Sequence, residues 1–251
     1  MQPIFTDTHC HIFSEYYPNI DNLLDNAQKN NIIKMINNGT DLKSNKEVLE
    51  ISEKHGQIYP AIGFHPEDID HFDTNNLKII EKNIDKIIAI GEIGLDYHYE
   101  NSNREKQKDL FELQLSLAEK YHLPVIVHSR DATEDTINIL KKYPTVRGSI
   151  HCFSGSLEIA QIYIKMGYKL GIGGVLTFKN SNLYKVIEQI SLNDIILETD
   201  SPYLTPEPYR GKQNEPSNII FIAKRICEIK NISLEELSKI TEKNVREIFD
   251  I

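Results

Sequence analysis

Apolar residues in this chain gather into eight short runs, separated by longer stretches with helical spacing. Each run has the length and the near-continuous apolar character of a strand that is buried on both faces. Between the runs, segments such as 103–122 and 156–167 carry apolar residues every three or four positions, as one face of a helix requires. The runs cover residues 3–9, 32–39, 58–65, 86–94, 123–129, 146–153, 168–174 and 194–200.

This alternation predicts a parallel sheet that is covered by helices on both faces. Eight strand and helix units in 251 residues match the size of a (β/α)8 barrel, or TIM barrel. We therefore predict a single α/β domain over residues 1–251. An open, doubly wound sheet is the alternative, but it more often has fewer strands and a glycine-rich phosphate loop near its start, which this sequence lacks.

Ionisable residues stand where the predicted strands end, which is where reactive side chains lie in such a barrel. Five of the nine histidines fall at these ends. His9 and His11 are two positions apart, and residues at that spacing in a strand project from the same face. The residues at the run ends are His9, His11, His65, Glu92, His128, His151 and Asp200.

Several histidines combined with carboxylates form a mixed nitrogen and oxygen ligand set. Such a set suits Zn²⁺ or Mn²⁺, and it accepts Mg²⁺ where carboxylates and water dominate. The three cysteines include no close pair that would make a closed structural zinc site or a disulfide framework. Unpaired cysteines are typical of a reducing compartment, so we expect a cytoplasmic protein.

The net charge of −9 limits the classes of partner. Proteins that bind duplex nucleic acid tightly and without sequence preference are usually basic. A polyanionic substrate would therefore have to be attracted by local charge or by metal ions. The chain has no apolar run long enough to span a membrane, and its first residues lack the features of a signal peptide. We expect no membrane partner.

Six motifs in order along the chain resemble those of the TatD family of metal-dependent deoxyribonucleases, a branch of the amidohydrolase superfamily. They run from near the N-terminus to the segment before the C-terminal helices, so the resemblance covers almost the whole chain. The motifs are TDTHCH, GEIGLDYHY, PVIVHSRDA, HCFSGS, LETDSPYLTP and RGKQNEP.

The resemblance implies a barrel of the metallo-dependent hydrolase type that holds two divalent ions, Mg²⁺, Mn²⁺ or Zn²⁺, in its mouth. It implies that His9, His11 and Glu92 bind one ion, with Glu92 as the bridging ligand. The second ion would be bound by His128 and His151. Asp200 would bind metal and handle the proton of the attacking water, so Asp200 and Glu92 are the predicted catalytic residues.

Five residues are candidates for binding the substrate, and four of them have a plainer structural alternative. His65 could touch a phosphate or cap its strand, and Tyr97 could stack on a base or pack beneath a loop. Arg210 and Lys212 could contact phosphate or merely occupy a charged surface loop. Asp96 could hold a metal-binding histidine from behind. The substrate candidates are His65, Tyr97, Arg130, Arg210 and Lys212.

The function favoured by these residues is metal-dependent hydrolysis of DNA phosphodiesters, with exonuclease action on single strands or ends. An alternative keeps the site but cleaves a carboxylic amide or ester, including an aminoacyl ester on tRNA. A third possibility is a metal-bound scaffold without turnover, against which the complete ligand set argues. We expect a monomer with DNA as substrate and no obligate protein partner.

Overall fold

The chain folds as a (β/α)8 barrel. The computed structural model describes residues 2–99 and 103–251, except for the side chains of 68, 70 and 71. Its sheet has the strand order β1 to β8 in chain order, and just beyond β8 Ser201 pairs with Cys10 of β1. Each strand overlaps one of the eight apolar runs, so the predicted barrel is confirmed and the open, doubly wound alternative is wrong.

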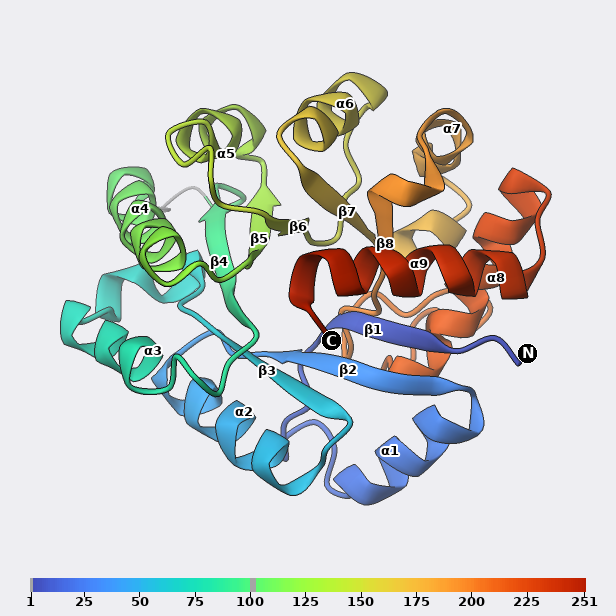
Figure 1. The fold of residues 1–251 in the computed structure, drawn as a ribbon, viewed down its shortest axis with the longest axis horizontal. Coiled ribbons are helices and arrows are strands. Elements are labelled where there is room, and N and C mark those ends of the chain that lie inside the picture. The colour runs from blue at the N-terminus through green and yellow to red at the C-terminus, as the bar shows by residue number, and fades with distance from the viewer. Residues whose placement is uncertain (1, 100–102) are drawn as a thin grey trace. The chain divides into compact units, whose positions relative to one another are not determined.

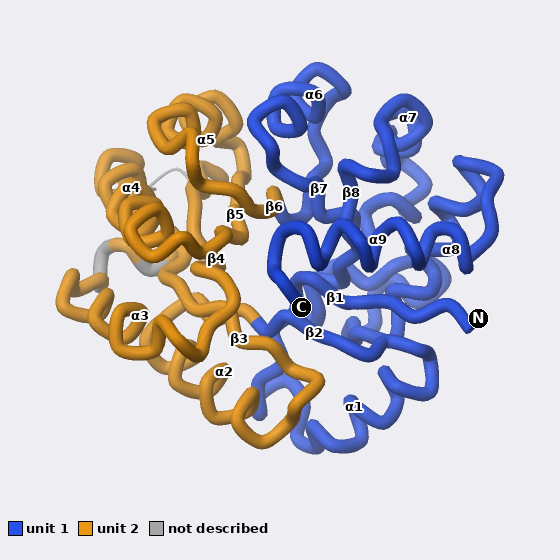
Figure 2. Tube along the Cα trace, viewed as in Figure 1, with its two compact units in different colours: residues 1–37, 151–251 blue, residues 38–150 orange. Residues whose placement is uncertain are grey.

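Contacts divide the chain into two compact units, which Figure 2 distinguishes by colour. Unit 1 covers residues 1–37 and 151–251, and unit 2 covers residues 38–150. A single domain over 1–251 stays a prediction. The elements of unit 1 are β1 (Phe5–Cys10), α1 (Ile20–Lys29), β2 (Ile32–Asn38, which ends at the boundary), α6 (Leu157–Lys165), β7 (Tyr168–Ile172), α7 (Leu183–Gln189), β8 (Ile195–Leu197), α8 (Ile219–Lys230) and α9 (Leu234–Phe249).

Unit 1 brings the first strand and the last helix together, as Figure 1 shows for β1 and α9. Ser238 of α9 accepts a hydrogen bond from the Ile4 N–H and donates one to the Ile4 carbonyl. One turn later, Glu242 accepts a hydrogen bond from the Thr6 hydroxyl at 3.0 Å. Helix α9 therefore holds the strand that carries the first histidines.

Unit 2 is built on four consecutive parallel strands. Its longest helix, α4, packs against β4. The helix agrees with the helical periodicity over 103–122. It begins after Asn103, whose side chain accepts a hydrogen bond from the Lys106 N–H. The elements are α2 (Leu42–Lys54), β3 (Ile58–Ile62), α3 (Lys78–Lys82), β4 (Ala89–Asp96), α4 (Arg104–Tyr121), β5 (Val125–Arg130), α5 (Thr133–Leu140) and β6 (Gly148–Ile150).

The seam between β8 and β1, inside unit 1, is closed by the buried carboxyl group of Asp7. It accepts hydrogen bonds from the Thr199 N–H at 2.9 Å, the Thr199 hydroxyl at 2.5 Å and the His9 N–H at 3.3 Å. Burial raises the pKa of Asp7 to about 8, because the interior disfavours its charged form. The carboxyl group thus joins the two strands although burial disfavours its charge.

Four buried amide side chains each take the place of a missing strand partner, and we call them the amide clamps. In unit 1, Asn37 accepts a hydrogen bond from the Ile12 N–H at 2.7 Å and donates one to the Ile12 carbonyl at 3.0 Å. Three clamps in unit 2 repeat this pattern. They join Asn45 to Gly63, Gln114 to Phe64 and Gln107 to Asp96.

The amide clamps act next to residues that the sequence marks as functional. Ile12 follows His11, Phe64 precedes His65, and Asp96 is itself clamped through its backbone. Backbone groups buried without a partner would cost free energy, so each clamp removes that penalty where the sheet ladder stops. The clamps therefore hold the backbone of these segments in one position.

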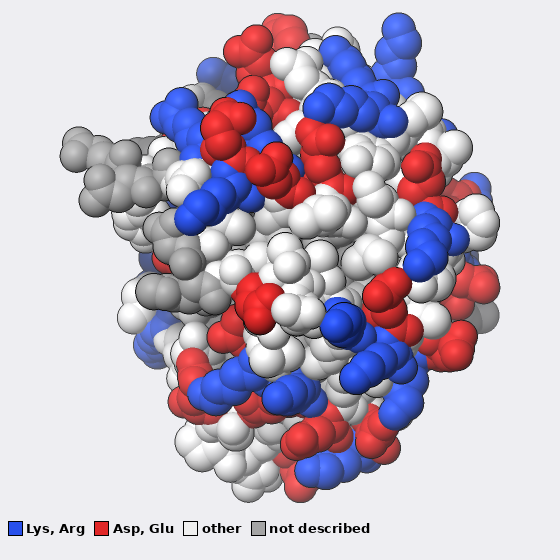
Figure 3. Space-filling view, turned by 90° about the vertical axis from the view of Figure 1, so that its left-hand side faces the viewer, with Lys and Arg blue, Asp and Glu red and all other residues white. Residues whose placement is uncertain are grey.

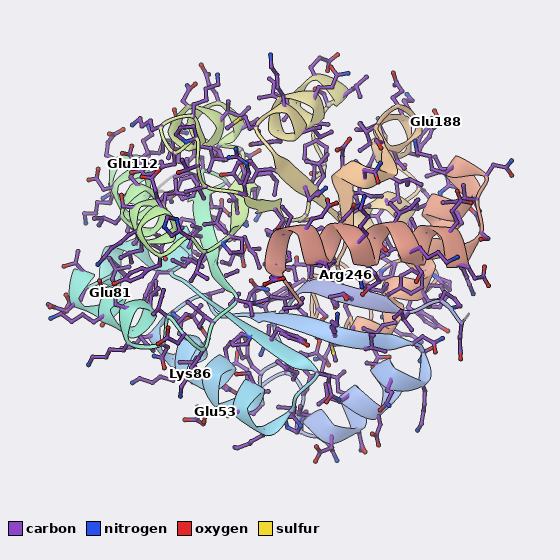
Figure 4. All side chains as sticks on the ribbon, in the orientation of Figure 1. Glu53, Glu81, Lys86, Glu112, Glu188 and Arg246 are labelled. Carbon is purple, nitrogen blue, oxygen red and sulfur yellow. The ribbon has the colours of Figure 1, made fainter. Side chains whose placement is uncertain are left out.

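Surface charges are mixed in sign. Figure 3 shows cationic and anionic side chains interspersed on the face that it presents. In unit 2, where Figure 4 labels both residues, Lys86 forms an ion pair with Glu53 at 2.6 Å between exposed side chains. Exposed pairs of this kind add little stability. Within the described residues, no helix combines the length and apolar character needed to cross a bilayer.

Replacing Gln114 with methionine should destabilise the fold, because the side chain keeps its length but loses both hydrogen bonds to Phe64. Leaving two buried backbone groups unpaired should lower the free energy of unfolding by about 2–4 kcal/mol. Urea denaturation followed by circular dichroism measures the change. The matched control is Gln189→Met on the exposed side of α7, which should stay within about 0.5 kcal/mol of the wild type. Equal stability of the two variants would contradict the clamp.

Candidate metal centre

Three ligand-type side chains of unit 1 converge at the seam between β8 and β1. The Nε2 atoms of His9 and His11 lie 3.2 Å apart, and they lie 3.7 and 3.6 Å from the same Oδ1 of Asp200. Ligands held 2.0–2.1 Å from a tetrahedral zinc ion stand roughly 3.3 Å from one another. The spacing of these three atoms therefore fits ligands of one shared ion.

The backbone places the three side chains by extending the parallel pairing beyond the last residue of β8. The Asp200 N–H donates to the His9 carbonyl at 2.9 Å, and the His11 N–H donates to the Ser201 carbonyl at 2.7 Å. Asp200 has a φ of 55°, in the left-handed region that aspartate enters more readily than most residues. This local turn directs its carboxylate back toward the histidines of β1.

Electrostatics keep the Asp200 carboxylate ionised at neutral pH. Burial by itself would raise its pKa, but a hydrogen bond from His11 and the electrostatic effect of His151, His9 and His11 outweigh burial and lower the pKa below 3.8. The side chain still retains 13 % of its exposure. An ionised, partly accessible carboxylate between two imidazoles can bind a cation or accept a proton.

The imidazole of His151 lies directly after β6 and packs within unit 1. Its ring is stacked on that of His9, with centroids 3.9 Å apart and planes 16° apart. Its Nδ1 lies 3.5 Å from Oε1 of Glu198, a carboxylate that is 1 % exposed. The same oxygen accepts a hydrogen bond from the Cys152 N–H at 2.5 Å. Glu198 thus contacts both the ring of His151 and the turn that follows it.

Glu198 is a residue that the sequence analysis missed. It lies two positions before Asp200 near the end of the eighth run, so the strand periodicity of two that linked His9 to His11 could have identified it. Its carboxylate fills the space above Gly171, where an added Cβ would lie 2.0 Å from Oε2. Glycine at position 171 therefore makes room for this carboxylate.

A second group of ligand-type residues surrounds His128 in unit 2. Its Nδ1 lies 3.0 Å from Oε1 of Glu92, and its Nε2 lies 3.0 Å from Oδ2 of Asp96. His65 Nε2 lies 3.7 Å from the same Glu92 oxygen. Burial by itself would raise the pKa of Asp96, but the hydrogen bond from His128 contributes to lowering it. Ligand atoms of His65, Asp96 and His128 lie within 4.8 Å of one another.

The chemistry of these donors fits divalent metal ions. Within the described residues, both groups offer imidazole nitrogen and carboxylate oxygen and no thiolate, which is the donor mixture suited to Zn²⁺ or Mn²⁺ in catalytic sites. The six predicted metal ligands all lie in or beside these two groups of residues. Unit 1 contributes His9, His11, His151 and Asp200, and unit 2 contributes Glu92 and His128.

Two predicted substrate contacts, both in unit 2, differ in their accessibility. Tyr97 is 9 % exposed, and its hydroxyl donates to Asp135 at 2.8 Å while the guanidinium of Arg104 covers its ring at 4.5 Å. These contacts match the alternative in which Tyr97 packs beneath a loop. Arg130, at the end of β5, is exposed, and its charge acts on Asp96. Their roles in substrate binding stay predictions.

The other two cationic candidates lie on the loop that follows β8. Arg210 and Lys212 are both exposed. The guanidinium of Arg210 stacks on the ring of Phe178 at 3.7 Å, and the ammonium of Lys212 lies 5.3 Å from the ring of Tyr209. Both cations are therefore held against aromatic rings in unit 1, with their charge still open to solvent.

Comparison with known proteins identifies one family over nearly the whole chain. The family model described as TatD related DNase matches residues 6–250. Among curated relatives, YabD of Bacillus subtilis is 39% identical, with 98% of each chain covered. YjjV of Escherichia coli K12 is 31% identical with the same coverage. Both relatives are described as uncharacterized metal-dependent hydrolases.

Solved structures agree with this identification. The crystal structure of YjjV, a TatD homolog from Escherichia coli K12, matches with a TM-score of 0.94 and 30% identity over 98% of each chain. A TatD family hydrolase from Entamoeba histolytica matches with a TM-score of 0.87 and 28% identity over 99% of each chain. An amidohydrolase from Saccharomyces cerevisiae, at 20% identity over 99% of this chain and 100% of its own, shares the fold with a TM-score of 0.86.

Replacing Gly171 with alanine should weaken metal binding without altering any predicted ligand. The new methyl group would meet Oε2 of Glu198 at 2.0 Å, so the carboxylate must leave its place beside His151. Partners of metal-binding histidines typically contribute about tenfold to hundredfold in affinity. We expect a loss of that size for Zn²⁺, measured by competition with a chromophoric chelator.

The matched control for this change is Gly173→Ala, two residues further along. An alanine Cβ there would meet its nearest neighbours at 3.7 Å, an ordinary contact, so metal affinity should be unchanged. Circular dichroism establishes that both variants are folded before they are titrated. A folded Gly171→Ala protein with wild-type zinc affinity would show that Glu198 does not support the site.

Proposed function

Since the chain belongs to the TatD-related DNase family of metal-dependent hydrolases, we propose that it hydrolyses phosphodiester bonds in DNA. The proposed activity is that of an exonuclease which trims single strands or exposed ends. The observation that carries the proposal is the convergence of His9, His11 and an ionised Asp200 at the seam between β8 and β1. A hydrolase of anionic esters needs such a site to hold cations and to accept a proton from water.

Two divalent ions are the proposed cofactors, as Mg²⁺, Mn²⁺ or Zn²⁺. When bound, they would neutralise charge on the phosphodiester and acidify the attacking water. Glu92 is proposed as the carboxylate that serves both ions. The proposed ligands are His9, His11, Glu92, His128, His151 and Asp200.

Asp200 is the proposed general base. Its pKa is low, so the carboxylate can orient the attacking water and receive its proton at neutral pH. The amide hydrogen bond from Asp200 to the His9 carbonyl holds the backbone of the base in place. The residual exposure of its side chain leaves a path by which water can reach it.

His65 is suited to donate a hydrogen bond to the substrate. Its Nδ1 accepts a hydrogen bond from the Glu67 N–H at 3.2 Å, so in the neutral ring the proton lies on Nε2. An Nε2–H donor in the loop after β3 can contact a non-bridging phosphate oxygen. The tautomer supports the proposed assignment of His65 to substrate binding.

The charge distribution favours a substrate of short or flexible strands. The chain as a whole is acidic, whereas proteins that wrap a duplex are usually basic. Arg210 and Lys212 supply local cations on the loop after β8, in the same unit as Asp200. These side chains are proposed to guide the phosphates on either side of the cleaved bond.

A panel of substrates tests the proposed function. Metal-free protein is supplied with each cation in turn and assayed on single-stranded DNA, duplex DNA, RNA, cyclic amides and aminoacyl-tRNA. We expect the highest kcat/KM on DNA strands with free ends, and no activity in excess chelator. Turnover of an amide or of aminoacyl-tRNA without cleavage of DNA would replace the proposal with the carboxylic amide or ester alternative.

The Asp200→Asn variant should retain the fold but lose turnover. The amide keeps the shape of the side chain while removing its charge and its capacity to accept a proton. We expect kcat on single-stranded DNA to fall by about a hundredfold or more. The control is Asp25→Asn on the exposed face of α1, which should leave kcat unchanged. An Asp200→Asn protein that melts at a lower temperature but has full activity per folded molecule would assign Asp200 a structural role.

A further inference from the structure

Two tyrosines from different loops of unit 1 form an exposed pair. Tyr16 lies between β1 and α1, and Tyr203 lies after β8. Their hydroxyl oxygens are 2.9 Å apart, and their ring centroids are 6.1 Å apart with planes at 71°. Half of Tyr203 is exposed to solvent, although aromatic side chains usually bury most of their area.

The tyrosine pair lies beside the ligands of the seam. The Tyr203 N–H donates to the Asp200 carbonyl at 2.8 Å. The Tyr203 ring lies 6.2 Å from the ring of His11, with the planes at 65°. The buried ring of Phe13 packs behind this pair, 6.0 Å from the ring of His11 and 6.2 Å from that of Tyr16. A group resting on Tyr203 would therefore lie next to the site that handles the phosphodiester.

The scaffold holds Tyr203 in its exposed position through buried contacts. The side-chain amide of Asn214, which is 0 % exposed, donates to the carbonyls of Tyr203 at 2.7 Å and Thr199 at 2.8 Å. The Tyr17 hydroxyl donates to the Asn214 carbonyl at 2.7 Å. An aromatic ring kept in water by a rigid support is ready to bind a flat partner at little entropic cost.

The second tyrosine is tied to the same loop. The side-chain amide of Gln213 donates to the Tyr16 carbonyl at 2.8 Å. Lys212 precedes Gln213 in the chain, and its carbonyl accepts a hydrogen bond from the Thr205 hydroxyl at 2.5 Å. The exposed cation of Lys212 therefore lies on the same loop as Tyr203. This arrangement suits a ligand that combines a ring with a phosphate.

We propose that Tyr203, supported by Tyr16, stacks on the nucleobase of the nucleotide next to the cleaved phosphodiester. This inference rests on the proposed function and adds a base-binding subsite to it. A base can rest on an aromatic ring only when it has left its own stack, so the subsite selects single strands and frayed ends over intact duplex. Every base has a flat face, so the subsite is tolerant of sequence.

The test combines a change in the protein with a matching change in the substrate. Wild-type protein and Tyr203→Ala are each assayed on a single strand and on the same strand with an abasic sugar next to the cleaved bond. We expect wild type to lose about tenfold in kcat/KM on the abasic strand. Tyr203→Ala should show a similar loss on the intact strand and little further loss on the abasic strand.

Two variants and one measurement separate stacking from other causes. Tyr203→Phe keeps the ring and should retain most of the wild-type preference for the intact strand. Tyr121→Ala removes a tyrosine at the end of α4, one that donates a hydrogen bond to Glu81 and belongs to no proposed site, and should leave the preference unchanged. Elemental analysis should find the same metal content in all variants.

The abasic sugar and the Tyr203→Ala change could each lower kcat/KM independently, so that the two losses multiply when they are combined. That result would overturn the base-binding subsite while leaving the DNase activity intact. If wild type cleaves no DNA, the proposed function itself fails. Binding of uncleavable phosphorothioate strands, followed by fluorescence anisotropy, then decides the subsite. Tighter binding of the intact strand than of the abasic strand, lost in Tyr203→Ala, would support it, and equal or absent binding would overturn it.

Discussion

The candidate site depends on a constraint of the backbone at the points where parallel strands stop pairing. There the chain turns into a loop, and its N–H and carbonyl groups are still buried, so they need partners that the sheet no longer provides. The amide clamps meet this need, since each side-chain amide offers an N–H donor and a carbonyl acceptor side by side, as a backbone peptide does. The histidines and carboxylates beside the clamps are thereby held by the interior of the protein and not by loop contacts alone.

Two aspartates of unit 1, Asp7 and Asp200, show how surroundings divide the work of identical side chains. Asp7 is fully buried beside a few hydrogen-bond donors, and burial raises its pKa to about 8. Asp200 lies among imidazoles, and its pKa falls. The first joins β8 to β1 through its hydrogen bonds, and the second holds a charge. Carboxyl groups with pKa values displaced in opposite directions are a frequent mark of a reactive centre.

The strands, the barrel and the ligand-type residues at strand ends could be predicted from sequence because they follow local periodicity and chain order. Contacts between distant segments could not, since no local pattern records them. Gln114 reads as a polar position of an amphipathic helix, yet it is fully buried against Phe64. Tyr97 follows a strand end as a reactive residue would, yet it packs against Arg104 and Asp135. Of these three residues, Glu198 is the one whose position could have been recognised from a local pattern, because it lies two residues before Asp200.

The two loops that present the tyrosine pair are joined to each other by Tyr17 and Gln213. Neither loop can change length freely, because a shift in one removes the hydrogen-bond partners of the other. Divergence of substrate preference on this scaffold should therefore proceed by paired changes in the segments after β1 and after β8. A chimera that takes both segments from a relative would acquire that relative's specificity. A chimera that takes one segment alone would lose the hydrogen bonds that join the two loops.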